Sequence, residues 1–252
     1  MVGPAAAGTE VVVLPGGVVA AWSDRSAGDL RPVPAADGPV RSLLARFAGG
    51  PSFARGLHAS SEDVPVIWLR QVHGDGVVVV DPGSDPSGIE GDALVAPAGT
   101  RAALAVLTAD CGSVALAGDD GSAAAVHAGW RGVAAGVVDR AVEALVTQGA
   151  TRVSAAFGPC VHPCCYAFSA DDLDAVADGL GPSVRGVTAA GEPALDLPAA
   201  LTAAISRSGA ELVGTVDRCT ACSGRDFSHR ARKDHGRQAL VVWPGGAGRG
   251  VG

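Results

Sequence analysis

Short apolar runs separated by turn residues dominate the first half of the chain. Residues 10–22 form two runs around the turn Pro15-Gly16-Gly17. Six more are bounded by Gly, Pro, Asp or Ser, at 64–69, 77–80, 93–95, 102–107, 114–117 and 123–126. Runs of this length predict β-strands, and their unbroken apolar character predicts that both faces are covered.

The hydrophobic period changes after residue 131. Between Gly132 and Gln148 apolar residues recur every three to four positions, which predicts one amphipathic helix ended by Gly149. The same reasoning predicts further helices at 40–47, 169–180 and 197–206 and further strands at 153–157, 211–216 and 239–243. Residues 23–39 are turn-rich and predict a surface loop.

The order of these elements predicts an α/β fold. No internal repeat and no linker between two cores is visible, so we expect a single layered catalytic domain over residues 1–252. Its core would run from about residue 10 to 243, and the Gly-rich tail 244–252 is predicted to be disordered.

Composition excludes several classes of protein. Apolar residues make up 48% of the chain and the mean hydropathy is +0.28, which is incompatible with disorder. A net charge of −7 argues against a nucleic-acid partner, because phosphate binding needs a basic surface. No apolar run is long enough for a membrane span, and an N-terminus without basic residues argues against a signal peptide. We therefore expect a cytoplasmic protein with its six cysteines as thiols.

Three strand ends carry residues that bind metals. His73, Cys111 and His127 each lie at or just beyond a predicted strand and are followed within two residues by glycine. Binding sites in open α/β sheets form at the carboxyl ends of strands. Two imidazoles and a thiolate suit zinc and leave a fourth position for water or substrate, while copper would bind the same set in vitro. The alternative is a buried, inert cysteine beside histidines that bond to backbone.

An anion site is predicted beside these residues. The helix that starts near Gly129 and Gly132 would offer free N–H groups, and Arg70 and Arg131 would add charge-assisted hydrogen bonds. Alternatively, both arginines are surface residues. Because Lys233 is the only lysine, we expect anion binding to depend on arginine, backbone amides and metal.

Several ordered motifs carry a family resemblance. They are Arg70-Gln71-Val72-His73-Gly74, Thr108-Ala109-Asp110-Cys111, residues 127–132, Gly158-Pro159-Cys160, Cys164-Cys165-Tyr166, Cys219-Thr220 and Phe227-Ser228-His229-Arg230. From about residue 20 to 243 the chain resembles the YfiH/YlmD-type proteins, known as laccase-domain polyphenol oxidases and as purine nucleoside phosphorylases. Where that family has a tyrosine after the serine, this chain has His229, which removes an aromatic contact.

The resemblance implies an α/β/α-type fold with mixed sheets and zinc held by His73, Cys111 and His127. It implies phosphorolysis of adenosine, inosine, guanosine and methylthioadenosine, together with adenosine deamination, so that the partners would be nucleoside and phosphate. We assign catalytic roles to Cys111, Asp110, Arg131 and Arg70, with Asp92 as a second choice for moving protons. We assign substrate binding to Arg25, Gln71, Gly129 and Gly132.

Other interpretations stay open at this point. A copper polyphenol oxidase is disfavoured, since multicopper oxidation needs more histidines than the six present. An amidase that edits a peptidoglycan precursor could use Cys111 and His127 as a nucleophile and its base. The remaining cysteines could form a second zinc site, although four of the five are positions of the family motifs: Cys160, Cys164, Cys165, Cys219 and Cys222. The sequence does not indicate the oligomeric state.

Overall fold

The structure is a computed structural model that describes residues 9–31, 65–81 and 83–246. The helix expected at 40–47 and part of the loop expected at 23–39 lie outside these residues. Two sheets, a small hairpin and six α-helices make up the described part of the chain.

The first sheet has five strands. Its order is β1 (Thr9–Val13), β2 (Val19–Ser23), β13 (Gln238–Trp243), β6 (Ala103–Thr108) and β3 (Val66–Trp68). Only the β3–β6 pair is parallel. The first and last described strands of the chain, β1 and β13, therefore lie in the same sheet with β2 between them.

The second sheet has six strands. Its order is β12 (Glu211–Thr215), β9 (Val153–Phe157), β7 (Gly112–Gly118), β8 (Ala123–Ala128), β5 (Ala93–Ala96) and β4 (Val77–Val79). The two outer pairs are parallel and the inner pairs antiparallel. Both sheets are mixed, and the predicted α/β class is confirmed.

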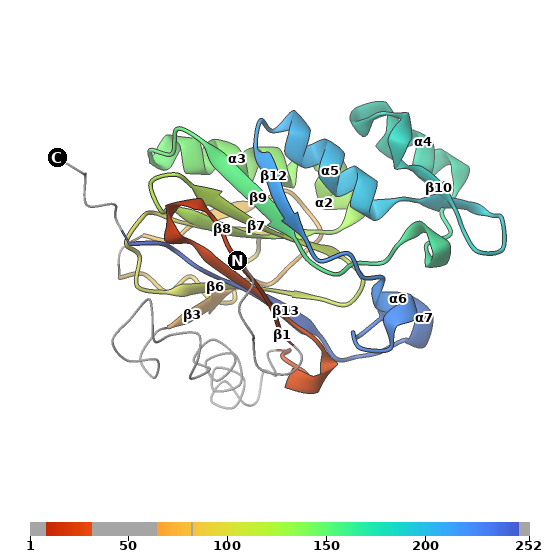
Figure 1. Cartoon of the computed structure of the whole chain (residues 1–252), viewed down its shortest axis with the longest axis horizontal. Helices are drawn as coiled ribbons and strands as arrows, with labels where there is room; N and C mark the ends of the chain where they lie inside the picture. The colour runs from red at the N-terminus through yellow and green to blue at the C-terminus, as the bar shows by residue number, and fades with distance from the viewer. Residues whose placement is uncertain (1–8, 32–64, 82, 247–252) are drawn as a thin grey trace.

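The sheets pack against each other, and helices cover the six-stranded sheet (Figure 1). An apolar cluster that includes Ile67, Leu94, Leu104 and Leu240 fills the space between the sheets. On the outer face of the six-stranded sheet lie α2 (Trp130–Ala135), α3 (Val137–Gln148) and α5 (Leu197–Arg207), with α4 (Ala170–Leu180) packed against α2 and α5. Alanine, valine and leucine form most of this core, as the low aromatic content requires.

The prediction of one continuous helix after the predicted ligand His127 is wrong. The single helix expected over 132–148 is broken at Gly136, whose φ of 92° is left-handed, so that α2 and α3 are separate. Of the tail expected to be disordered, 244–252, only residues 244–246 belong to the described part of the chain, and these contact the core. Gly245 donates its N–H to the Gly121 carbonyl and accepts from the Gly99 N–H.

Short elements were not predicted. The hairpin of β10 (Arg185–Val187) and β11 (Pro193–Leu195) and the helices α6 (Thr220–Ser223) and α7 (His229–Arg232) span three or four residues each, too few for a period to show. Four 3₁₀ turns complete the described structure: η1 (Pro15–Gly17), η2 (Arg25–Ala27), η4 (Pro163–Cys165) and η5 (Pro182–Val184). No helix in the described ranges has the length and apolar character needed to cross a membrane.

Candidate functional site

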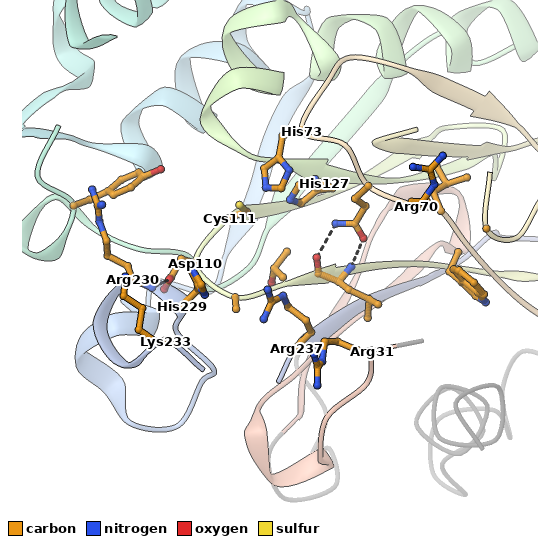
Figure 2. Close-up of a pocket in the computed structure, with 18 residues that line it drawn as sticks. Arg31, Arg70, His73, Asp110, Cys111, His127, His229, Arg230, Lys233 and Arg237 are labelled. Carbon is orange, nitrogen blue, oxygen red and sulfur yellow. Dashed lines mark hydrogen bonds between the residues drawn. The ribbon is translucent and has the colours of Figure 1, made fainter. Parts of the chain in front are cut away.

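The three predicted ligands meet where the chain passes between the sheets. His73 lies on the connection from β3 to β4 and Cys111 on that from β6 to β7, and both connections run from the five-stranded to the six-stranded sheet. His127 is buried on β8. Figure 2 shows the three side chains side by side, and their ligand atoms lie within 4.8 Å of one another. The structure therefore brings together residues that are up to 54 positions apart.

This donor set fits the metal that the resemblance implies. Zinc–nitrogen bonds of about 2.0–2.1 Å and zinc–sulfur bonds of about 2.3 Å place tetrahedral ligand atoms roughly 3.3–3.8 Å apart. Gly129 lies against all three ligands. A methyl group added there would be 3.0 Å from His73 Cδ2 and 3.4 Å from Cys111 Sγ, so the absent side chain leaves the ligands their space.

The carboxylate of Asp92 holds the ligand set in position through hydrogen bonds. Its Oδ1 lies 2.7 Å from His127 Nδ1 and accepts the His73 N–H at 2.9 Å. Its Oδ2 accepts the N–H groups of Gly74 at 2.8 Å and Val72 at 3.3 Å. The carboxylate is completely buried. It therefore fixes the ring of His127 with Nε2 toward the site and holds the loop that carries His73, as carboxylates behind metal-binding histidines do.

The charges of the site reinforce one another. Burial disfavours the Cys111 thiolate, but hydrogen bonds with His127 and His73 outweigh it and lower the pKa of Cys111 to about 6. Burial also disfavours the His127 imidazolium, yet Asp92 and Cys111 raise the pKa of His127 to about 9. Cys111 and His127 thus form a thiolate–imidazolium pair at neutral pH.

Strained backbone is concentrated at this site. Within the described ranges, the non-glycine residues with positive φ are His73 (62°), Asp110 (91°) and Lys233 (56°), and all three line one cavity. Such conformations persist only where surrounding contacts impose them. Asp110 shows these contacts. Its carboxylate accepts the Thr220 hydroxyl at 2.6 Å and the Arg230 N–H at 2.5 Å, and its carbonyl accepts the Val161 N–H.

The cavity has a volume of about 1060 Å³ and joins the ligand set to a group of cations (Figure 2). Its lining includes two aromatic rings, Tyr166 and Trp68. The Trp68 indole N–H is buried and has no hydrogen-bond partner among the described residues. The cationic side chains of the lining are Arg31, Arg70, Arg230, Lys233 and Arg237. The lining thus includes Lys233, the one lysine of the chain, beside the arginines that the sequence led us to expect at an anion site.

The five cations differ in their partners. Arg31 and Arg70 form ion pairs with Asp29 and Glu90. No ion pair with a carboxylate occurs among the described residues for the other three cations, Arg230, Lys233 and Arg237. Among the described residues the guanidinium of Arg237 donates to backbone carbonyls, and that of Arg230 donates to the Ala167 carbonyl and stacks 4.9 Å from the centre of the Tyr166 ring. These three side chains give the cavity wall an excess of positive charge.

The other predicted site residues take different places. Gln71 lines the cavity, but its amide is bonded twice to the backbone of Leu107, which ties the His73 loop to β6. Arg25 pairs with Asp234 and Arg131 stacks on Trp130, and neither is part of the cavity lining. Gly132 packs against the Gly74 carbonyl, where a Cβ would come within 2.6 Å. Gly132 belongs to α2, which begins at Trp130 and has only six residues.

No site role was assigned from the sequence to the wall of the cavity that lies across from the ligand set, which we call the second wall. This wall consists of the residue that directly follows η4, Tyr166, and of residues from α7 and the loop after it: His229, Arg230, Lys233 and Arg237. These segments have no strand-end pattern that would mark a site. Two signals were available: the family motifs that contain Tyr166, His229 and Arg230, and the concentration of cations between Arg230 and Arg237 in an otherwise acidic chain.

Known proteins match this chain over most of its length. The sequence profile of the family described as "Multi-copper polyphenol oxidoreductase laccase" matches residues 52–245. A purine nucleoside phosphorylase of Mycobacterium bovis is 42% identical over 181 residues, which are 71% of this chain and 72% of that protein. Another from Streptomyces griseus is 38% identical over 215 residues, which are 83% of this chain and 82% of that protein.

Solved structures share the fold. A Neisseria meningitidis protein, described as a DUF152 family member, superposes with a TM-score of 0.75 at 25% identity and covers 95% of this chain and 100% of its own. YlmD from Geobacillus stearothermophilus superposes with a TM-score of 0.76 at 24% identity and covers 97% and 98% of the two chains. The chain thus shares the fold of these two solved structures.

Proposed function

Because the chain belongs to the multi-copper polyphenol oxidoreductase laccase family, in which its matched relatives are named purine nucleoside phosphorylases, we propose that it is a metal-dependent purine nucleoside phosphorylase. The observation that carries the proposal is the shared cavity. One end holds the ligand set His73, Cys111 and His127, and the opposite wall holds three cations without carboxylate partners. Such a cavity suits a ligand pair of an uncharged nucleoside and a phosphate anion.

Different residues of the cavity would bind the phosphate and the purine. Arg230, Lys233 and Arg237 would bind phosphate oxygens by charge-assisted hydrogen bonds and hold the anion for attack. The ring of Tyr166 and the free indole N–H of Trp68 would contact the purine. Asp110 would act through its bond to the Arg230 backbone, which places the phosphate site next to Cys111.

The reaction joins phosphate to ribose and releases the base. An oxygen of the bound phosphate forms a bond to C1′ as the bond from C1′ to the purine nitrogen breaks, and the purine leaves with the bonding electrons and takes up a proton. Positive charge develops on the ribose, and the negative phosphate next to it stabilises that charge. Zinc is the metal we assign to His73, Cys111 and His127, where it would supply a Lewis acid. Adenosine, inosine, guanosine and methylthioadenosine are the proposed substrates, and deamination of adenosine is a proposed second activity.

The test is turnover by the zinc-loaded protein. Adenosine with phosphate should yield adenine and ribose 1-phosphate, whereas adenosine without phosphate should yield only inosine. Cys111→Ala should abolish both reactions. Lys233→Ala should raise the KM for phosphate roughly 10- to 100-fold, because a hydrogen bond to a charged group contributes about 1.5–3 kcal/mol. Arg152→Ala removes an exposed arginine outside the cavity and should change neither reaction. Absence of phosphate-dependent base release from every purine nucleoside would refute the proposal.

Copper-dependent oxidation of phenols is the second candidate. The family description favours it, and the same two imidazoles and one thiolate would bind copper tightly. Copper-loaded and zinc-loaded protein should be compared on one phenol and on adenosine with phosphate. Phenol turnover with copper and no nucleoside turnover with zinc would favour this alternative.

A further inference from the structure

Four of the remaining cysteines converge on one point of the structure. Cys164 and Cys165 belong to η4, whereas Cys219 and Cys222 belong to the segment of α6, more than 50 residues later. The Cys164 sulfur lies 3.6 Å from that of Cys165, 3.8 Å from that of Cys219 and 3.6 Å from that of Cys222. The sulfurs of Cys165 and Cys222 are 3.2 Å apart. We call these residues the four-cysteine cluster.

The spacing of the cluster matches a single tetrahedral ion. Four thiolates bound to zinc at about 2.3 Å define a tetrahedron with edges of roughly 3.8 Å. The four sulfur–sulfur distances lie between 3.2 and 3.8 Å, and all sulfurs lie within 4.8 Å of one another. Sulfurs in a disulfide would be about 2.05 Å apart. The pattern Cys219-x-x-Cys222 also has the spacing of structural zinc sites.

The backbone holds the two segments of the cluster together. Cys160 and Cys219 form an isolated parallel bridge, in which Thr220 donates its N–H to the Cys160 carbonyl at 3.0 Å. The His162 N–H lies 3.4 Å from the Cys219 sulfur, as a donor to a thiolate would. Cys222 is exposed and the other three members are half-buried, which leaves a route for an ion. Four thiolates at this distance would repel one another strongly, and a divalent cation removes that cost.

We propose that the four-cysteine cluster binds one Zn²⁺ as a structural site, separate from the set of His73, Cys111 and His127. The ion would connect η4 to α6 and so fix the second wall of the cavity. Tyr166 directly follows Cys165, and α6 is bonded to α7 through Arg232, which donates to the Ala221 carbonyl at 2.9 Å. Thr220 of α6 also donates to Asp110. The proposal that the ion binds does not depend on the proposed function. The expected effect of the ion on substrate affinity does rest on the proposed function.

The experiment is metal analysis of the full chain, purified with zinc under reducing conditions. We expect two zinc ions per wild-type chain and one per chain in the double variant His73→Ala, Cys111→Ala, which leaves the cluster intact. Cobalt in that variant should give the visible spectrum of a tetrahedral site with four thiolates. Chelation should then lower the Tm of the same variant.

Variants of the cluster and a control complete the test. Cys219→Ser with Cys222→Ser should retain one zinc, bound by the other set, with a lowered Tm. Cys160→Ala removes a cysteine outside the cluster and should leave the metal content unchanged. The proposal is overturned if the double variant His73→Ala, Cys111→Ala holds no metal, whether the four thiols of the cluster react freely or mass spectrometry shows disulfides. Because the readout is metal content, this failure differs from an absence of nucleoside turnover.

Discussion

At the scale of residues, the site depends on one buried carboxylate as much as on its ligands. Asp92 accepts four hydrogen bonds, and two of its donors belong to the ligands His73 and His127. Sequence reasoning considered Asp92 only as a second choice for moving protons. Its burial and its filled bonding capacity favour a positioning role instead.

Replacement of Asp92 tests this positioning role. Asp92→Asn puts an amide N–H₂ among donors that need an acceptor, so the His127 ring and the His73 loop lose support. We expect zinc affinity at the histidine–cysteine set to fall about 10- to 100-fold, the usual effect of losing such a partner. Competition with a chromogenic chelator measures this, with Asp119→Asn as a control at an acidic residue that accepts hydrogen bonds from Thr151 and Arg152, away from the ligand set. Unchanged affinity would contradict the role of Asp92.

The pH dependence of metal binding follows from the paired charges of Cys111 and His127. Zinc needs a thiolate and a neutral imidazole. Between pH 6 and pH 9 the thiol is already ionised and His127 is still protonated, because their pKa values are about 6 and about 9. Zinc binding at pH 7.5, close to the middle of this range, should therefore release about one proton from this pair, and affinity should rise with pH until about pH 9.

Calorimetry in two buffers of different ionisation enthalpy measures this proton release. The measurement is best made with Cys219→Ser, Cys222→Ser protein, so that only the histidine–cysteine set binds zinc. No proton release at pH 7.5 would show that the thiolate–imidazolium pair does not form.

At the scale of elements, one glycine decides how the chain leaves the site. Gly136 adopts a left-handed conformation that separates α2 from α3, so the periodic stretch after His127 forms two helices instead of one. The apolar pattern continues across the break, because both helices pack on the same face of the six-stranded sheet. Periodicity therefore identified the buried face but not the interruption.

The same substitution at two glycines should have opposite effects on stability. Gly136→Ala forces a side chain into φ of 92° and should lower the free energy of unfolding by about 1–2 kcal/mol. Gly179→Ala lies within α4, where the nearest atom to the new methyl group is Arg207 Nη1 at 3.9 Å. It should raise the free energy of unfolding by roughly 0.5–1 kcal/mol. Denaturant unfolding of both variants checks this, and equal effects would contradict the assigned conformations.

At the scale of the whole molecule, the site depends on how the two sheets face each other. Trp22 of β2 donates its indole N–H to the Ser113 hydroxyl of β7 at 3.0 Å, and both residues are buried. Gly158 lies directly against the Trp22 ring, where a Cβ would come within 2.0 Å. Ser113 also pairs with His127 across β7 and β8, so this contact between the sheets lies next to the ligands.

Removal of the Ser113 hydroxyl tests the contact between the sheets. Ser113→Ala leaves the buried Trp22 N–H without an acceptor and should lower the free energy of unfolding by about 1–3 kcal/mol. Adding Trp22→Phe removes the stranded donor, so the double variant should lose less than the sum of the two single variants. Additive losses in denaturant unfolding would show that the two side chains do not interact in solution.

The sequence by itself determined the α/β class and most strand positions, and it singled out the three residues that we propose as metal ligands. These properties depend on local periodicity, on turn residues and on the side-chain chemistry of His73, Cys111 and His127. The tertiary structure decided which distant segments meet. It placed Asp92 beneath the ligands, Lys233 in the cavity wall, and η4 against α6 to form the four-cysteine cluster. Such contacts arise from the packing of two sheets and several three- or four-residue elements, and contacts between distant segments leave no periodic pattern in the chain.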